Sequence, residues 1–154
     1  MNIKNYTSNV PIERTISHIE QRLAESGADG IMKEYTTGQL TALSFRVTLP
    51  EDGQKVSVRL PANVEGVYVS LSKEVRKPRA GTLERIREQA GRTAWKLMLD
   101  WCEVQLSLIA MQQAEFRQVF LAYILTDGKR TFFDRLKKDN FLALGPPKSH
   151  EDPR

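Results

Sequence analysis

The side chains on which most catalytic and metal sites are built are scarce in this sequence of 154 residues. It has one cysteine, Cys102, and two histidines, His18 and His150. Zinc sites need clustered cysteine and histidine side chains, and calcium sites need an Asp-rich loop of defined spacing. The sequence contains neither pattern, so we expect no metal and no cofactor.

Glycine-rich phosphate loops and long apolar runs are also absent. The nine glycines stand singly at predicted turns, which excludes nucleotide hydrolysis through a Walker or Rossmann loop. No stretch reaches the ~20 uninterrupted apolar residues of a bilayer span, and residues 1–10 lack the apolar core of a secretion signal. A single cysteine in an apolar run fits a reducing compartment. We expect a cytoplasmic protein with no membrane partner.

The composition itself is that of an ordinary globular protein, with 40% hydrophobic and 27% charged residues. A chain of this length buries about two-thirds of its unfolded surface in one core, and two independent domains would be cramped. We predict a single α+β domain over residues 1–144. From Gly145 the chain is Pro-rich, polar and without periodicity, so residues 145–154 are expected to be a disordered tail.

Hydrophobic periodicity predicts one helix and three strands in the N-terminal half. After Pro11, apolar residues at spacings of four, three and four indicate a one-faced helix that ends near Gly27: Ile12, Ile16, Ile19 and Leu23. Three extended segments with turn residues between them follow, at residues 30–36, 41–49 and 56–60. We predict that they form a three-stranded antiparallel meander.

The remainder of the chain is predicted to be helical. One helix is expected between Pro61 and Pro78, and a long one from Thr82, as N-cap, to about Met111. The long helix would measure about 45 Å, more than the sheet is wide, so one end must project or find a partner. Its second half is apolar on nearly every side, which is typical of a helix covered by other elements or another subunit. We therefore expect a homo-oligomer. Shorter helices are predicted over residues 115–123 and after Thr131.

Few side chains are candidates for catalysis. Asp100 and Glu103 lie one helical turn apart in an apolar stretch, where desolvation can favour acid–base chemistry. A capped or salt-bridged pair is the favoured interpretation. Burial is favoured for Cys102, because only Lys96 is near enough in sequence to stabilise a thiolate. His18 is interpreted as solvated or packed at an edge. We predict no catalytic residues and a protein that is not an enzyme.

Positive charge is concentrated in one segment. The formal net charge is +4, and residues 73–96 contain eight basic and three acidic residues, or +5, which accounts for the whole excess. Cations aligned in this way bind a phosphate backbone. The predicted anion-binding residues are Lys73, Arg76, Lys77 and Arg79 before the long helix, Arg85, Arg92 and Lys96 on one stripe of it, and Arg46 and Arg59 on the polar face of the sheet.

A solvated helix explains the same basic residues. Pairs such as Glu88 with Arg92 stabilise an exposed helix by about a few tenths of a kcal/mol each. The only aromatic residue near the segment is Trp95, at its margin, which weighs against stacking on single-stranded bases. The pattern alone leaves ligand binding and simple solubility open.

Several blocks of the sequence resemble a family of small proteins encoded in phages and prophages. They are IKNYTS at residues 3–8, ALSFRV at 42–47, RLPANV at 59–64, REQAGRTAW at 87–95, Asp100-Trp101 and VQLSLI at 104–109. The resemblance covers most of residues 1–123. It implies a small binding protein made in a bacterial or archaeal host during infection or lysogeny, and it brings no catalytic residues to carry over.

Two functions follow from that resemblance and the basic charge. The first is DNA handling during phage replication or recombination. The alternative is inhibition of host immunity, by occluding a defence protein or by sequestering a nucleotide signal. Sequestration needs an enclosed pocket, often at a subunit interface, whereas DNA binding needs an open basic stripe. We favour DNA or a similar anionic partner.

Overall fold

The computed structural model of the chain describes residues 3–146. A first helix and a three-stranded antiparallel sheet, paired in chain order, form the N-terminal half: α1 (Ile12–Glu25), β1 (Ala28–Thr36), β2 (Gln39–Thr48) and β3 (Lys55–Arg59). The helical half comprises α2 (Val64–Ser72), α3 (Thr82–Ala110), α4 (Phe116–Phe120) and α5 (Phe132–Lys138), with 3-10 turns at Leu121–Tyr123 and Leu142–Leu144. The predicted α+β fold is confirmed. Of the predicted tail, residues 147–154 lie outside the described residues.

Helix α1 buries the face that its periodicity predicts. Ile16, Ile19 and Leu23 are buried, together with Thr15. Gly27 follows the helix with a φ of +97°, and its N–H donates to the carbonyl of Ala24 at 3.1 Å. A positive φ favours glycine because a Cβ would collide with the backbone. The predicted end of the helix is therefore confirmed.

The register of β1 and β2 is set by the first turn together with a one-residue shift between Glu34 and Tyr35. Thr37 and Gly38 both have positive φ, at 51° and 76°, which is the geometry of a type I′ hairpin and matches the twist of the strands. Phe45 in the central strand then lies opposite Ile31 of β1 and Val58 of β3. The face that carries Phe45 and Val58 is buried under the helices.

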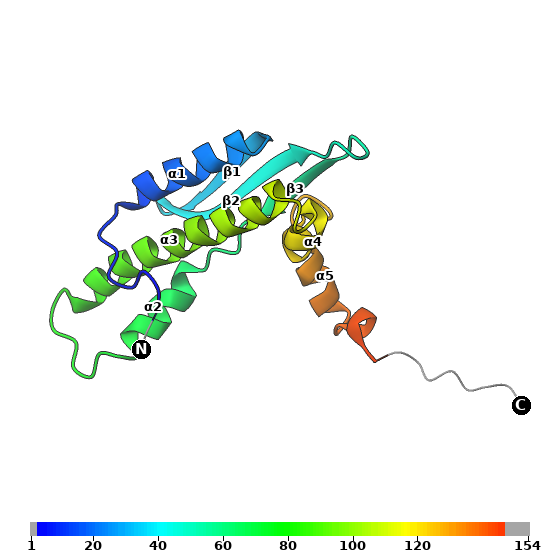
Figure 1. Cartoon of the computed structure of the whole chain (residues 1–154). Coiled ribbons are helices and arrows are strands. Elements are labelled where there is room, and N and C mark those ends of the chain that lie inside the picture. Colours follow the sequence, from blue (N-terminus) through cyan, green and yellow to red (C-terminus); the bar gives the residue numbers. More distant parts are fainter. Residues whose placement is uncertain (1–2, 147–154) are drawn as a thin grey trace, which may run out of the picture.

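The core lies between this face and helices α1 and α3, which cover the same side of the sheet (Figure 1). Its largest side chains, Trp95, Phe45 and Phe120, are fully buried. The Phe120 ring stands edge-on to the rings of Phe45 and Trp101, with centroids 5.6 and 5.7 Å apart. Such pairs contribute about 0.5–1.5 kcal/mol beyond buried area, so α4 closes one end of the core.

Helix α3 spans 29 residues, close to the predicted length, and its N-terminal half extends beyond the sheet beside α2 (Figure 1). The prediction that one end projects is confirmed. The predicted N-cap was wrong by one residue, because Gly81, with a φ of +77°, caps the helix. The Thr82 hydroxyl instead accepts a hydrogen bond from the N–H of Arg79, at 3.1 Å. Helix α2 likewise starts after Asn63, whose side chain caps it, and not at Pro61.

Helices α1 and α3 approach closely at Gly91. A Cβ at this position would lie 2.7 Å from Ile12 Cδ1, well inside van der Waals contact. Ala90 and Ala94, both buried, continue the strip of small residues on α3. The absence of a side chain at residue 91 therefore leaves room for the end of the Ile12 side chain.

We predict that the effect of Gly91→Ala depends on Ile12. In wild type, the new Cβ must displace the flexible end of the Ile12 side chain, which offsets part of the helix-propensity gain of about 1 kcal/mol, so the substitution raises the free energy of unfolding by less than that gain. In an Ile12→Val background, which lacks the Cδ1 atom, the substitution stabilises by the full gain. Urea unfolding of the four proteins measures both effects, and equal effects in the two backgrounds would contradict the packing described here.

The C-terminal half of α3 carries a partly exposed apolar stripe. Its members recur at spacings of four, three, four and three: Leu97, Trp101, Val104, Leu108 and Met111. Val104 is 56% exposed and Met111 71% exposed. Among the helices of residues 3–146, none has the length and hydrophobicity of a bilayer span. We propose that a second copy of the chain covers this stripe.

The expected outcome is a mass above the 17.6 kDa of the monomer in light scattering at tens of micromolar. Val104→Glu should shift the protein toward the monomer, because a charge on the stripe would be buried without a partner. Leu142→Glu is the matched control, since Leu142 is 80% exposed and lies outside the stripe. A strictly monomeric wild type would overturn the proposed self-association.

Candidate anion-binding site

The N-terminal segment, residues 3–10, is fastened along α3 by its own carbonyl groups. Gln89 Nε2 donates to the carbonyl oxygens of Tyr6, at 2.7 Å, and Ser8, at 3.2 Å. Arg92 Nε donates to the same Ser8 oxygen at 3.2 Å. The bonds use main-chain atoms of the segment, so they hold its path without engaging the Tyr6 ring.

A second set of contacts holds the start of the segment to Asp100. The Asp100 carboxylate accepts a hydrogen bond from Asn5 Nδ2 at 2.9 Å and lies 2.8 Å from Lys4 Nζ. Partial burial opposes ionisation, but the bonds from Lys4 and Asn5 and the charges of Lys4 and Lys96 outweigh it. The pKa of Asp100 is therefore held below its ordinary value, and the group is an anion at neutral pH.

A cleft of about 470 Å³ lies between this segment and the end of α2, over the first turns of α3. Apolar atoms of Leu71, Val75 and Ile86 form part of its wall. Tyr6, which is 46% exposed, lines it from the N-terminal segment. Its polar lining residues are Thr82, Arg85, Glu88, Gln89 and Arg92.

Beside the cleft, the projecting end of the molecule carries five exposed cations, which we call the basic tip: Lys73, Arg76, Lys77, Arg79 and Arg85. Four lie in the connection between α2 and α3 or at its edge, and Arg85 lies in the first turns of α3. Within residues 3–146, none of the five forms an ion pair. The structure thus brings together five of the nine predicted residues.

The other four predicted residues have different surroundings. Arg92 lines the cleft but holds Ser8, and Lys96 is half-buried further along α3. Arg46 and Arg59 lie on the sheet face opposite the helices, which separates them from the basic tip. Each pairs with a carboxylate of β1 at 2.7 Å, Arg46 with Asp29 and Arg59 with Glu34. These pairs neutralise both arginines.

Both candidate catalytic carboxylates, Asp100 and Glu103, form ion pairs with other parts of the chain. Glu103 lies 3.6 Å from Arg22 and 3.8 Å from His18, on α1, while Asp100 binds the N-terminal segment. The favoured interpretation of a salt-bridged pair is confirmed, although the two carboxylates pair with different elements. His18 is exposed at the edge of α1, as expected.

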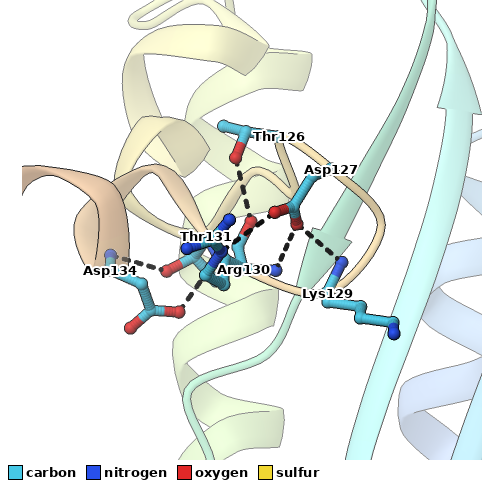
Figure 2. Close-up of polar contacts among 6 residues, drawn as sticks. All are labelled: Thr126, Asp127, Lys129, Arg130, Thr131 and Asp134. Carbon is cyan, nitrogen blue, oxygen red and sulfur yellow. Dashed lines mark hydrogen bonds and ion pairs between the residues drawn. The ribbon is translucent and has the colours of Figure 1, made fainter. Parts of the chain in front are cut away.

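A second, polar hollow lies near α5. Beside it is a turn closed by a bridge between Leu125 and Thr131, and Figure 2 shows the polar contacts within this turn. Asp127 accepts hydrogen bonds from the backbone N–H groups of Arg130, at 2.7 Å, and Lys129, at 3.0 Å, and from Arg130 Nε at 2.9 Å. These bonds hold the pKa of Asp127 far below its ordinary value. The Asp127 carboxylate therefore closes a turn. Within residues 3–146, no group of three or more acidic, histidine or cysteine side chains is arranged to hold a metal ion.

Tyr6 is the aromatic residue of the cleft, and sequence reasoning missed it. It is 83 residues from its hydrogen-bond partner Gln89, so no local pattern connects it to the basic segment. Trp95, the aromatic residue that the sequence placed nearest, is only 1% exposed and belongs to the core.

Comparisons with protein-family models, curated proteins and solved structures found no match to this chain.

Cys102 provides a test of the buried side of α3. Burial, with a smaller contribution from Glu103, raises the pKa of its thiol to about 12. The neutral thiol should therefore persist throughout the ordinary pH range and resist a thiol reagent at about pH 8 in the folded protein. Unfolding in guanidinium should expose one reactive thiol per chain, and Cys102→Ser should abolish that reaction. Rapid labelling before unfolding would show that the thiol is accessible.

Proposed function

We propose that this is a small non-catalytic protein of phage or prophage origin that binds nucleic acid in the host cytoplasm. The basic tip makes the contact, through phosphate groups of the polymer. The observation that carries the proposal is the absence of ion pairs, within the described residues, at five cations on the projecting end of the molecule. DNA handling during replication or recombination is the setting that fits this chemistry.

Arginines elsewhere in the described residues are more often paired. Six of nine lie within ion-pair distance of a carboxylate: Arg22, Arg46, Arg59, Arg87, Arg117 and Arg130. The basic tip, in contrast, gathers five cations in one short segment without an ion pair to any described residue. Three acidic residues, Glu74, Glu84 and Glu88, are close in sequence to the basic tip, yet none forms an ion pair with it within the described residues. Five cations against three acids leave a positive excess there. Like charges held close repel one another, and a bound polyanion would relieve that repulsion.

The shape of the basic tip favours a polymer over a small signal molecule. Its residues are exposed on a projecting loop and helix start, where a phosphate backbone can pass along them (Figure 1). A protein that sequesters a nucleotide would instead surround it, because affinity for a small ligand depends on burying most of its surface. The open arrangement supports the first of the two functions.

We predict that neutralising the basic tip weakens DNA binding without unfolding the protein. The variant replaces Arg76, Lys77, Arg79 and Arg85 by alanine, which leaves Arg92 to hold the N-terminal segment. The slope of log affinity against log salt should fall by up to about 3, at ~0.7–0.9 for each phosphate group that the variant no longer neutralises. The thermal midpoint should stay within a few degrees, because exposed charges contribute little to stability.

A matched control separates a site from general electrostatic attraction. Replacing Lys129, Arg135, Lys137 and Lys138, basic residues on and around α5, removes the same charge. Affinity and salt slope should change much less in this control. Equal losses in the two variants would mean that net charge, and not the basic tip, binds DNA. A wild type that fails to bind DNA at low salt would overturn the proposal and favour a host defence protein as partner.

A further inference from the structure

The cleft beside the basic tip contains the parts of a nucleotide site. It is open to solvent, and its volume of about 470 Å³ is large enough to receive one nucleotide unit. Apolar wall residues Leu71, Val75 and Ile86 lie together with cationic side chains. A nucleotide unit has the complementary combination of a flat base and a phosphate.

Tyr6 is placed as a stacking surface for such a base. Its carbonyl is held by Gln89 at 2.7 Å, and its N–H donates to the carbonyl of Ile3 at 3.3 Å. The backbone at Tyr6 is therefore bound in place while the residue remains 46% exposed at the cleft. An exposed aromatic side chain on a fixed backbone can stack on a base, and only its own side-chain torsions must be ordered.

Two guanidinium groups supply the positive charge of the cleft. Arg85 forms no ion pair within the described residues. Arg92 donates from Nε to Ser8 and from Nη2 to Gln89 Oε1, at 2.7 Å, and its remaining N–H donors are available to a ligand. Glu88 also lines the cleft and opposes an anion, so the net charge of these three side chains is positive by one.

We infer that this cleft binds one nucleotide unit of a single-stranded nucleic acid, with the base against Tyr6 and the phosphate on Arg85 and Arg92. The inference rests on the proposed function and makes it more specific. In a duplex both faces of each base are covered by stacking, so the cleft accepts only an unpaired unit. Every base presents a similar face to an aromatic ring, so the sequence preference is weak.

The test compares a fluorescent oligothymidylate, a duplex of equal length and free thymidine monophosphate, by anisotropy at one salt concentration. Wild type should bind the single strand more tightly than the duplex. Tyr6→Ala should weaken single-strand binding about 5- to 100-fold and leave duplex binding nearly unchanged. Tyr6→Phe, which keeps the ring, should retain the wild-type affinity. Glu88→Gln should strengthen single-strand binding a few-fold.

The alanine variant should remain folded, because the hydrogen bonds at residue 6 use backbone atoms, and its thermal midpoint provides the check. Equal binding of strand and duplex by wild type, or a Tyr6→Ala variant that binds the single strand normally, would overturn the cleft inference and leave the basic tip intact. Loss of all nucleic-acid binding by wild type would overturn the proposed function itself. If free thymidine monophosphate binds more tightly than the oligothymidylate, the cleft is a nucleotide site, but its ligand is not a nucleic-acid polymer.

Discussion

The arrangement of this fold depends on a mismatch between helix α3 and the sheet it covers. Its 29 residues span about 44 Å, whereas the ten residues of β2 span about 33 Å and three strands are only about 15 Å across. The C-terminal half can pack on the sheet and α1, but the N-terminal half needs other partners. Helix α2 covers part of it, and residues 3–10 cover another part. Where these two coverings do not meet, the cleft remains.

Features that depend on neighbouring residues could be predicted from the sequence. The apolar spacing of α1, the turn at Thr37-Gly38 and the length of α3 are each properties of a short window, and the structure confirms them. The predicted N-cap of α3 was wrong because two adjacent residues, Gly81 and Thr82, can both cap a helix. Gly81 caps α3 because its positive φ is free of steric cost, which leaves the Thr82 hydroxyl to order the preceding turn.

Features that depend on distant residues could not be predicted in the same way. The alternation of β2 and β3 placed Arg46 and Arg59 on the polar face, but nothing local indicates that β1 brings an acid within 2.7 Å of each one. The same limit applies to Tyr6, which reaches the cleft only because Gln89 and Arg92 fasten its segment to α3. Charge counts along a sequence therefore overstate a binding surface, since they include cations that the fold neutralises.

Arg85 and Arg87 show how the fold assigns different roles to similar residues. Two positions apart on a helix, they point about 200° apart around its axis. Arg87 faces α2, where it lies 2.9 Å from Glu65 and over the Tyr68 ring at 3.8 Å, so it adds an exposed contact between α2 and α3. Arg85 faces the cleft and has no such partner in the described residues. The charge of Arg87 is thus balanced by a neighbouring element, whereas Arg85 remains available at the edge of the cleft. A lysine at residue 87 would keep the charge but lose the planar stack on Tyr68.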